Sequence, residues 1–266
     1  MVYLELGKGH NEATMGQGIT ATSTSLAGSA GGGIRMEGVT KSYGPMQALK
    51  GIDLELAKGE FLAVFGPNGS GKTTLIRILA TLTRPTSGRV IIGGYDLRDK
   101  AGQARSILGV VTHQPLLYED LTAYENLAFY GRMYGVPNVK ERIHAVVEQV
   151  GMTHRLHDKI RTLSHGMQKR FAIARAILHD PSVLLMDEPE SGLDQDAILR
   201  LQEIIEGLSR QGRTVVMVTH NLGWGARLGS QVLILKEGKV AFRARCADLD
   251  AEFFTATYAR LTEAKS

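Results

Sequence analysis

The chain has little cysteine and no long hydrophobic run. Because Cys246 is its single cysteine, it cannot form an internal disulfide, which agrees with a reducing compartment. No apolar run approaches the roughly 18 residues that a membrane-spanning helix needs. The sequence also opens without a charged-then-apolar signal segment. These absences argue against a secreted or membrane-spanning protein and predict a soluble, cytoplasmic one.

Dense charge of one sign is also lacking. The net charge is +4, and lysine and arginine are spread along the chain. A DNA-binding protein that makes about 6–10 phosphate contacts usually shows a dense basic patch, so nucleic acid is not a favoured partner. The 266 residues are 43% hydrophobic and 22% charged, which is ordinary for a globular protein. The motifs must therefore indicate the function.

One glycine-rich run, residues 66–74, fits the phosphate-binding pattern G-x-x-x-x-G-K-[ST]. A strand is predicted before it at 61–65 and a helix after it at 74–80, which makes a chance glycine turn the weaker alternative. Glycines let successive N–H groups converge on oxyanions, and the helix start adds positive charge. Lys72 is predicted to reach the outer phosphates and Thr73 a magnesium ion. The predicted nucleotide-binding residues are Gly66, Pro67, Asn68, Gly69, Ser70, Gly71, Lys72, Thr73 and Thr74.

Two carboxylates follow a second apolar strand, Val183–Met186. Ligands bind beyond the carboxyl ends of parallel strands, so Asp187 and Glu188 are expected near the phosphate loop. Asp187 is predicted to hold magnesium, and Glu188 to orient and polarise the attacking water. The alternative is a solvated acidic turn. Upstream, Ser164 is a candidate N-cap, and Gly166 allows close backbone approach.

The remaining patterns alternate between strands and helices, without an internal repeat. This alternation predicts an α/β fold whose mainly parallel core sheet is covered on both faces. Short strand-like runs at 34–39, 52–56 and 89–92 predict an antiparallel sheet beside the nucleotide. The other predicted elements are a helix whose residues 143, 146, 147 and 150 share one face and which Gly151 ends, helices at 167–179, 198–208 and 250–261, a strand at 214–218, and a hairpin at 231–242 that turns at 237–238.

In their order along the chain, these motifs resemble those of the nucleotide-binding subunit of an ATP-binding cassette (ABC) transporter, over about residues 34–243. The matches are Gly66–Thr74 with Walker A, Leu163–Gln168 with the Leu-Ser-Gly-Gly-Gln signature, Val183–Glu188 with Walker B and its catalytic glutamate, Ser191–Asp194 with the D-loop, Gln114 with the Q-loop glutamine, His220 with the switch histidine, and Tyr43 with the aromatic that stacks on adenine.

The resemblance implies an α/β P-loop NTPase of the ABC ATPase type. Its mainly parallel core sheet would carry an antiparallel β subdomain and a helical subdomain at about 115–180. Residues 34–243 would form this domain, followed by a short extension over 244–266. Residues 1–33, rich in Gly, Ser, Thr and Ala, are predicted to be a flexible tail, with a mistaken upstream start codon as the alternative.

The resemblance also implies ATP and Mg²⁺ as ligands and assigns roles to residues. The implied catalytic residues are Glu188, His220, Gln114 and Lys72, and the implied metal ligands are Thr73, Gln114 and Asp187. Tyr43, Ser164, Gly166 and Asp194 join the nucleotide-binding set, with Ser164 and Gly166 closing the ATP of an opposite subunit. That partner would be a second copy or another ABC ATPase. The structural alternatives are a strand tyrosine for Tyr43, a surface amide for Gln114, a strand cap for His220 and a helix N-cap for Asp194.

Two residues depart from the family pattern. His165 replaces the first glycine of the usual Gly-Gly pair and is expected to alter dimer affinity. Glu190 replaces the threonine or alanine common after the Walker B proline. It is expected to weaken ATP binding slightly by repulsion, an effect that magnesium and solvent screen.

The implied function is an ATP-hydrolysing subunit that powers a separate membrane transporter from the inner face of the cell membrane. Leu116, Leu117 and Tyr118 are predicted to receive a cytoplasmic helix of that partner, or else to lie in the core.

Residues 112–127 and the compact C-terminal end resemble the haem-exporter ATPase of bacterial cytochrome c maturation. The alternative is the ATPase of another exporter, for drugs, lipids or polysaccharide. A role on DNA or ribosomes is disfavoured, because the chain has one cassette, no heptad run and no cysteine cluster.

Overall fold

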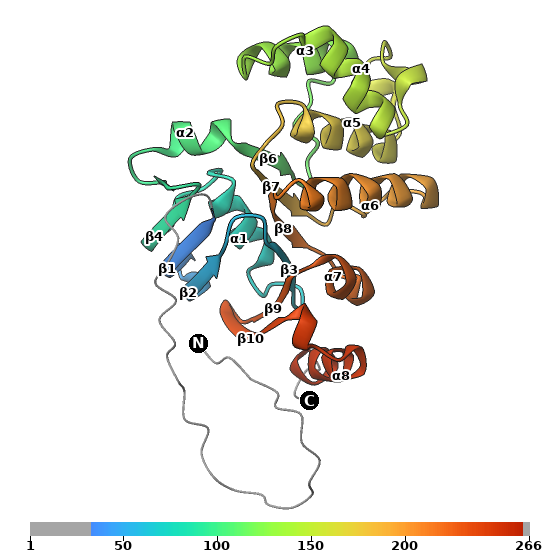
Figure 1. Cartoon of the computed structure of the whole chain (residues 1–266). Coiled ribbons are helices and arrows are strands. Elements are labelled where there is room, and N and C mark those ends of the chain that lie inside the picture. The colour runs from blue at the N-terminus through green and yellow to red at the C-terminus, as the bar shows by residue number, and fades with distance from the viewer. Residues whose placement is uncertain (1–32, 263–266) are drawn as a thin grey trace, which may run out of the picture.

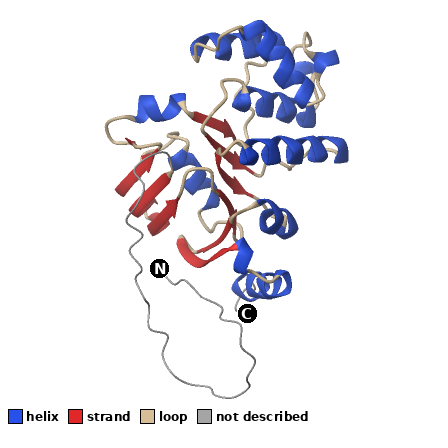
Figure 2. Ribbon diagram, viewed as in Figure 1, coloured by secondary structure: helices blue, strands red, loops and turns tan. Residues whose placement is uncertain are grey.

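A six-stranded sheet forms the centre of the molecule (Figures 1 and 2). The computed structural model describes residues 33–262, so the predicted tail lies outside the described residues except for Gly33. The sheet has the order β10-β9-β3-β8-β7-β6, with β10 antiparallel to β9 and the other neighbours parallel. Its strands are β3 Phe61–Phe65, β6 Leu108–Val111, β7 Val183–Asp187, β8 Thr214–Val218, β9 Gln231–Lys236 and β10 Lys239–Arg245. The predicted mainly parallel core sheet is confirmed.

A second, antiparallel sheet lies beside the first, in the order β2-β1-β4-β5. Its strands are β1 Ile34–Tyr43, β2 Met46–Leu56, β4 Ser87–Ile92 and β5 Tyr95–Asp96. Helix α1 (Lys72–Leu79) packs between the two sheets, because one apolar cluster joins its buried face to residues of both. Leu62 and Val64 of β3 belong to that cluster, whereas Ala63 and Phe65 point to the opposite face. Side chains of β3 thus alternate between the two faces of the sheet, and residues 66–71 join the end of β3 to the start of α1.

Three helices form a separate layer beyond β6 and β7, in the upper part of Figure 1: α3 Ala123–Met133, α4 Val139–Gln149 and α5 His165–Ile177. Short 3₁₀ turns η1 (Thr153–Arg155) and η2 (Ile160–Thr162) join α4 to α5. The α4 residues at the predicted apolar spacing are buried. As predicted, Gly151 ends α4: its N–H donates to Glu148 O (2.9 Å) and the next N–H, of Met152, to Val147 O (3.0 Å). The layer falls within the predicted range of 115–180, and the division into domains stays a prediction.

The other face of the core sheet is covered by α6 (Gln195–Arg210), α7 (Leu222–Leu228) and α8 (Ala251–Thr262), with the 3₁₀ turn η3 (Cys246–Asp248) before α8. Phe254 of α8 meets Phe65 edge to face, with ring centroids 5.3 Å apart. The predicted terminal helix therefore supports the strand that leads into the phosphate loop. Within the described residues, none of the helices combines the length and the apolar character needed to cross a membrane.

Besides the two-residue strand β5 and the 3₁₀ turns, the sequence did not predict β6, α7 and α2 (Ala101–Ser106). Strand β6 has four residues, too few for a clear pattern. Helix α7 contains Gly223 and Gly225, and glycine is a poor helix former. A Cβ on Gly225 would lie 2.2 Å from the ring of Phe65. The glycine is thus explained by close packing of α7 on β3, which only the folded chain reveals.

Candidate nucleotide site

The phosphate loop curls between β3 and α1 as the pattern predicts. A Cβ on Gly66 would lie 2.2 Å from Leu235 O of β9, so the loop passes close to the neighbouring strand. Among the described residues, no side chain caps the start of α1. The N-cap residue is Gly71, whose φ of 104° lies in the left-handed region. Lys72 Nζ donates to Gly66 O (2.7 Å) and Pro67 O (3.0 Å). The loop therefore gathers a helix start and a cation at one point, as an anion site requires.

The Walker B carboxylates lie beside this loop. Asp187, at the end of β7, is 5% exposed and accepts a hydrogen bond from the Thr73 side chain. Burial raises its pKa, as does the charge of Glu188, while Thr73 and the lysines 169 and 72 oppose the shift. Burial lowers the pKa of Lys72, and Glu188 and Asp187 oppose that shift. The structure thus brings Lys72, Thr73, Asp187 and Glu188 together, as predicted.

The residues around Asp187 fit a magnesium ion. Asp187 Oδ1 is buried and has no hydrogen-bond partner within residues 33–262, and Thr73 is a hydrogen-bonding neighbour of the same carboxyl group. Oxygen ligands of this kind suit Mg²⁺, which usually keeps phosphate oxygens and waters as its further ligands. The described residues contain no group of three or more His, Cys, Asp or Glu arranged to hold a metal. Phosphate oxygens and waters would complete the shell around such an ion.

Glu188 meets the switch histidine directly. His220 Nε2 lies 2.8 Å from Glu188 Oε1, so the ring does more than cap strand β8. Glu188 has a φ of 48°, in the left-handed region that residues other than glycine rarely occupy. Its N–H donates to Val218 O (3.0 Å), and its own carbonyl accepts from Ser191 N–H (3.2 Å). Backbone bonds on both sides hold this strained conformation, a feature that often marks a functional position.

The signature segment starts α5. Ser164 Oγ accepts from Met167 N–H at 3.4 Å, which confirms the predicted N-cap. A Cβ on Gly166 would lie 2.7 Å from Gly192 O, so the predicted close backbone approach is to the D-loop of the same chain. Counted residue by residue, Met167 holds the fifth place of the Leu-Ser-Gly-Gly-Gln pattern. The glutamine that follows, Gln168, donates to Ile160 O and Leu163 O and so points into its own protomer.

Asp194 caps helix α6, accepting from Ala197 N–H at 2.9 Å. Its carboxyl group also accepts a hydrogen bond from the Arg170 guanidinium at 2.5 Å. The hydrogen bond from Ala197 N–H, and after it the charge of Arg170, lower the pKa of this carboxyl group. The N-cap alternative is therefore confirmed. The nucleotide-binding role of Asp194 stays a prediction, compatible with this one.

Two predicted ligands are exposed. Tyr43 ends β1 with 42% of its surface accessible, and Lys41 Nζ lies 4.9 Å from the ring centroid. The hairpin that carries it borders the phosphate loop, since a Cβ on Gly71 would lie 2.7 Å from Ala48 O of β2. Gln114 lies in the exposed segment after β6, where its carbonyl accepts from Thr112 Oγ1 (2.6 Å). Their binding roles stay predictions.

The two departures from the family pattern that the sequence analysis named, His165 and Glu190, have different surroundings. The ring of His165 lies over Gly192 and 6.3 Å from the ring of His113. The Oε1 of Glu190 accepts a hydrogen bond from the Thr219 hydroxyl, and its Oε2 is buried. The predicted repulsion of the nucleotide by Glu190 stays a prediction. Near it lies Lys169, which is 1% exposed and which the sequence did not single out. The sequence feature that could have identified Lys169 is its position among the apolar residues of α5.

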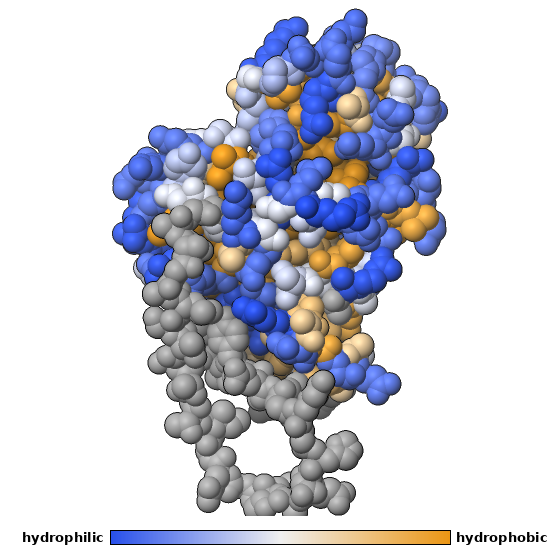
Figure 3. All heavy atoms as spheres, in the orientation of Figure 1, coloured by the Kyte–Doolittle hydropathy of each residue, from blue (hydrophilic) through white to orange (hydrophobic). Residues whose placement is uncertain are grey.

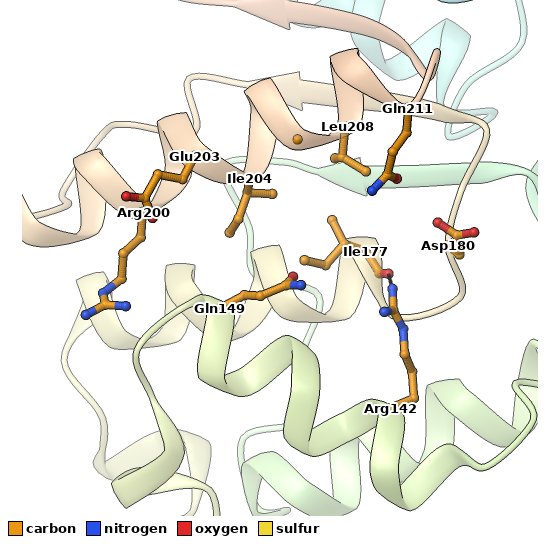
Figure 4. A pocket seen from close by; sticks show the side chains of 10 residues that line it. Arg142, Gln149, Ile177, Asp180, Arg200, Glu203, Ile204, Leu208 and Gln211 are labelled. Atoms are coloured by element: carbon orange, nitrogen blue, oxygen red, sulfur yellow. Dashed lines mark hydrogen bonds between the residues drawn. The ribbon is translucent and has the colours of Figure 1, made fainter.

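A separate hollow of about 300 Å³ opens between α4, α5 and α6 (Figure 4). Both arginines of its lining have partners: Arg142 donates to Ile177 O and Leu178 O, and Arg200 pairs with Asp196. None of the predicted nucleotide-site residues lines it. The hollow is a gap between packed helices, distinct from the nucleotide site.

The fold and the site together are those of a nucleotide-hydrolysing P-loop ATPase. The family described as ABC transporter matches residues 49–191, more than half of the chain. The chain is 36% identical over 231 residues to the linearmycin resistance ATP-binding protein LnrL of Bacillus subtilis (strain 168), covering 86% of this chain and 74% of LnrL. It is 35% identical over 208 residues to the Nod factor export ATP-binding protein I of Cupriavidus metallidurans, covering 77% and 69% of the two chains.

Among solved structures, it is similar to a dimeric post-hydrolysis state of the ATP-binding cassette MJ0796 bound to ADP and Pi. The identity is 30% and the TM-score 0.75, with 80% of this chain and 98% of the other covered. The chain belongs to the ABC transporter ATP-binding family: it is the ATP-binding, ATP-hydrolysing subunit of a transporter.

Proposed function

We propose that this chain powers a small-molecule exporter of the resistance type. The observation that carries this proposal is the similarity over most of the chain to proteins named for linearmycin resistance and Nod factor export. This is the drug-exporter alternative predicted from the sequence. Haem export, the more specific sequence prediction, gains no support from either named relative. The chain would act from the inner face of the cell membrane on separate membrane subunits.

In the proposed cycle, Lys72 and the loop N–H groups bind the phosphates, and Tyr43 stacks on adenine. Thr73, Asp187 and Gln114 would hold Mg²⁺, which when bound neutralises charge on the phosphates. Glu188 orients the attacking water, and the 2.8 Å contact with His220 supports this role by fixing the carboxylate. The positive charge of Lys72 stabilises the negative charge on the departing γ-phosphate in the transition state.

We further propose a head-to-tail dimer, formed with a second copy or with a related ATPase subunit. Ser164 and Gly166 would approach the γ-phosphate of the ATP held by the partner. The similarity to the dimeric MJ0796 cassette supports this arrangement. Loss of the γ-phosphate would remove the bridge and let the subunits separate, a population shift driven by the different affinities for ATP and ADP.

The proposed docking surface for the membrane partner comprises Leu116, Tyr118, Phe129 and Met133. Their exposed fractions are 37%, 50%, 43% and 56%, and the rings of Tyr118 and Phe129 meet edge to face at 5.4 Å. In the upper, helical part of Figure 3, hydrophobic residues are interspersed among hydrophilic ones. A hollow of about 530 Å³ lies along α3 beside Phe129 and Met133. A grouped, exposed apolar surface is typical of an interface, and an amphipathic helix of the membrane subunit fits it.

Leu117 does not share this role, because it is partly buried and packs against the core cluster. The sequence analysis treated Leu116, Leu117 and Tyr118 as one group, with a position in the core as the alternative. The structure supports that alternative for Leu117, whereas Leu116 and Tyr118 are exposed.

Tyr118→Asp and Met133→Asp should each reduce capture of the membrane subunit of the transporter by at least about tenfold, since a charge would enter an apolar contact. Basal ATPase activity should stay within about twofold of wild type. The measurement is pull-down from detergent with the tagged ATPase. Leu199→Asp, at a 52% exposed leucine on α6, is the matched control. Full capture by both folded docking variants would reject this surface.

Cells that carry this gene and its membrane subunits should resist antibiotics at least about fourfold better than cells carrying the Glu188→Gln version, because hydrolysis drives export. The measurement is inhibitory concentration and efflux over a panel of such compounds, with cytochrome c maturation as the competing readout. Lost cytochrome c maturation with unchanged resistance would favour the haem prediction over this proposal.

A further inference from the structure

The hairpin that joins β1 to β2 carries an exposed aromatic ring beside the phosphate loop. Tyr43 pairs with Met46 across this hairpin, and both side chains are exposed. Directly opposed residues of an antiparallel pair share one face of the sheet, so the two form an apolar surface at the hairpin tip. The Ala48 carbonyl of the same hairpin lies against Gly71, the N-cap of α1, which sets this surface next to the loop. An exposed ring in that place offers a flat face on which a base can stack.

Lys41 covers one face of the Tyr43 ring. Its Nζ lies over the ring, 4.9 Å from the centroid, which is the geometry of a cation–π contact. None of the ion pairs within residues 33–262 includes Lys41, so no carboxylate there neutralises this ammonium. Because an aromatic ring has two faces, a stacking ligand has to use the face opposite Lys41.

Hydrogen bonds hold Lys41 in this place. Its Nζ also donates to Arg84 O at 2.8 Å. The backbone on either side of Lys41 is tied to the same segment: Ser42 N–H donates to Thr86 Oγ1 (3.0 Å), and Thr86 N–H donates to Thr40 O (2.8 Å). This segment comes shortly after α1, whose first turn leaves the phosphate loop. The helix that starts at the phosphate loop therefore leads, at its far end, into the segment that anchors Lys41.

We infer that Lys41 is a positioning residue for the base of ATP, acting through the Tyr43 ring. With its ammonium on one face and its anchor at Arg84 O, Lys41 holds the ring so that adenine stacks on the other face. A side chain that is already held in place loses less conformational freedom when its ligand binds, which favours binding. The inference rests on the stacking role proposed for Tyr43.

This role differs from that of a lysine that merely attracts the phosphates. Tripolyphosphate carries the phosphate chain of ATP without the base. A long-range charge effect would act on both ligands, because both are strongly negative. Loss of a ring-positioning lysine should instead weaken the binding of ATP and spare tripolyphosphate.

The test is isothermal titration of the full chain with Mg-ATP and with Mg-tripolyphosphate. Lys41→Met should raise the Kd for ATP about threefold, the size expected of an exposed cation–π contact, and change the Kd for tripolyphosphate by less than about 1.5-fold. Lys41→Arg should bind ATP within about 1.5-fold of wild type, because a guanidinium also sits on an aromatic face. Lys50→Met is the matched control, since it removes an exposed lysine opposite Thr40 on β2 and should change neither Kd.

Tyr43→Leu completes a double-mutant cycle. Alone, it should raise the Kd for ATP at least about fivefold, as loss of base stacking predicts. In that background, Lys41→Met should change the Kd for ATP by less than about 1.5-fold, because there is no ring left to position. Equal weakening of ATP and tripolyphosphate in Lys41→Met, the same ATP loss with and without the ring, or an equal loss in Lys50→Met would overturn the inference.

Two results separate this inference from the proposals on which it builds. Unchanged ATP affinity in Tyr43→Leu would remove the stacking role proposed for Tyr43, and the role of Lys41 with it. Weakened ATP binding in Tyr43→Leu together with wild-type affinity in Lys41→Met would remove the role of Lys41 alone. These titrations need no membrane subunit, so their outcome is independent of what the transporter exports.

Discussion

Glu188→Gln should lower kcat for ATP hydrolysis by about 10²–10³-fold, the range expected for loss of a group that orients and polarises water. The amide has nearly the same shape but a much weaker attraction for a proton. The affinity for ATP should change by less than about threefold, because Lys72 and the phosphate loop remain intact. Phosphate release and titration with a fluorescent ATP analogue measure the two quantities. If the chain dimerises on ATP, the variant should accumulate as the closed dimer.

Glu206→Gln is the matched control for this change. It removes one carboxylate from the exposed face of α6, where Glu206 pairs with Arg210 at 3.7 Å. Its turnover should equal that of wild type, since an exposed pair contributes little. Near-normal turnover of Glu188→Gln would exclude Glu188 as the water-orienting group. It would leave His220 and Lys72 as the residues to explain hydrolysis.

Much of this site could be predicted because its residues lie in short contiguous runs. The phosphate loop and the acidic end of β7 each follow an apolar strand, and parallel strands bring their carboxyl ends to one edge. That rule is enough to place Asp187 and Lys72 together. The contact between Glu188 and His220 follows in the same way, since β7 and β8 are neighbours.

Burial was the quantity that the sequence did not provide. Leu116, Leu117 and Tyr118 are adjacent and similarly apolar, and only packing separates Leu117 from its exposed neighbours. Lys169 was missed for the converse reason, because a lysine on a helix is normally solvated. Its hydrogen-bond acceptor, the Thr112 carbonyl, lies 57 residues away in the sequence. Local patterns carry no information on such contacts.

Gly66→Ala should lower the affinity for ATP by about 100-fold, or about 2.7 kcal/mol. The added Cβ would lie 2.2 Å from Leu235 O and 2.6 Å from Ser70 Oγ, and backbone must move to relieve the first clash. The free energy of unfolding should fall by about 2–4 kcal/mol, because the displaced strand end belongs to the core sheet.

Gly94→Ala separates this clash from backbone strain alone. Gly94 also has a positive φ, 82°, but nothing lies within 4 Å of its ideal Cβ position. Its replacement should cost only the left-handed strain of about 1–2 kcal/mol and leave ATP binding unchanged. Isothermal titration with Mg-ATP and urea unfolding measure both variants. Equal stability losses, with ATP affinity retained in Gly66→Ala, would show that the loop does not need its close passage beside β9, and the phosphate site would then have to lie elsewhere.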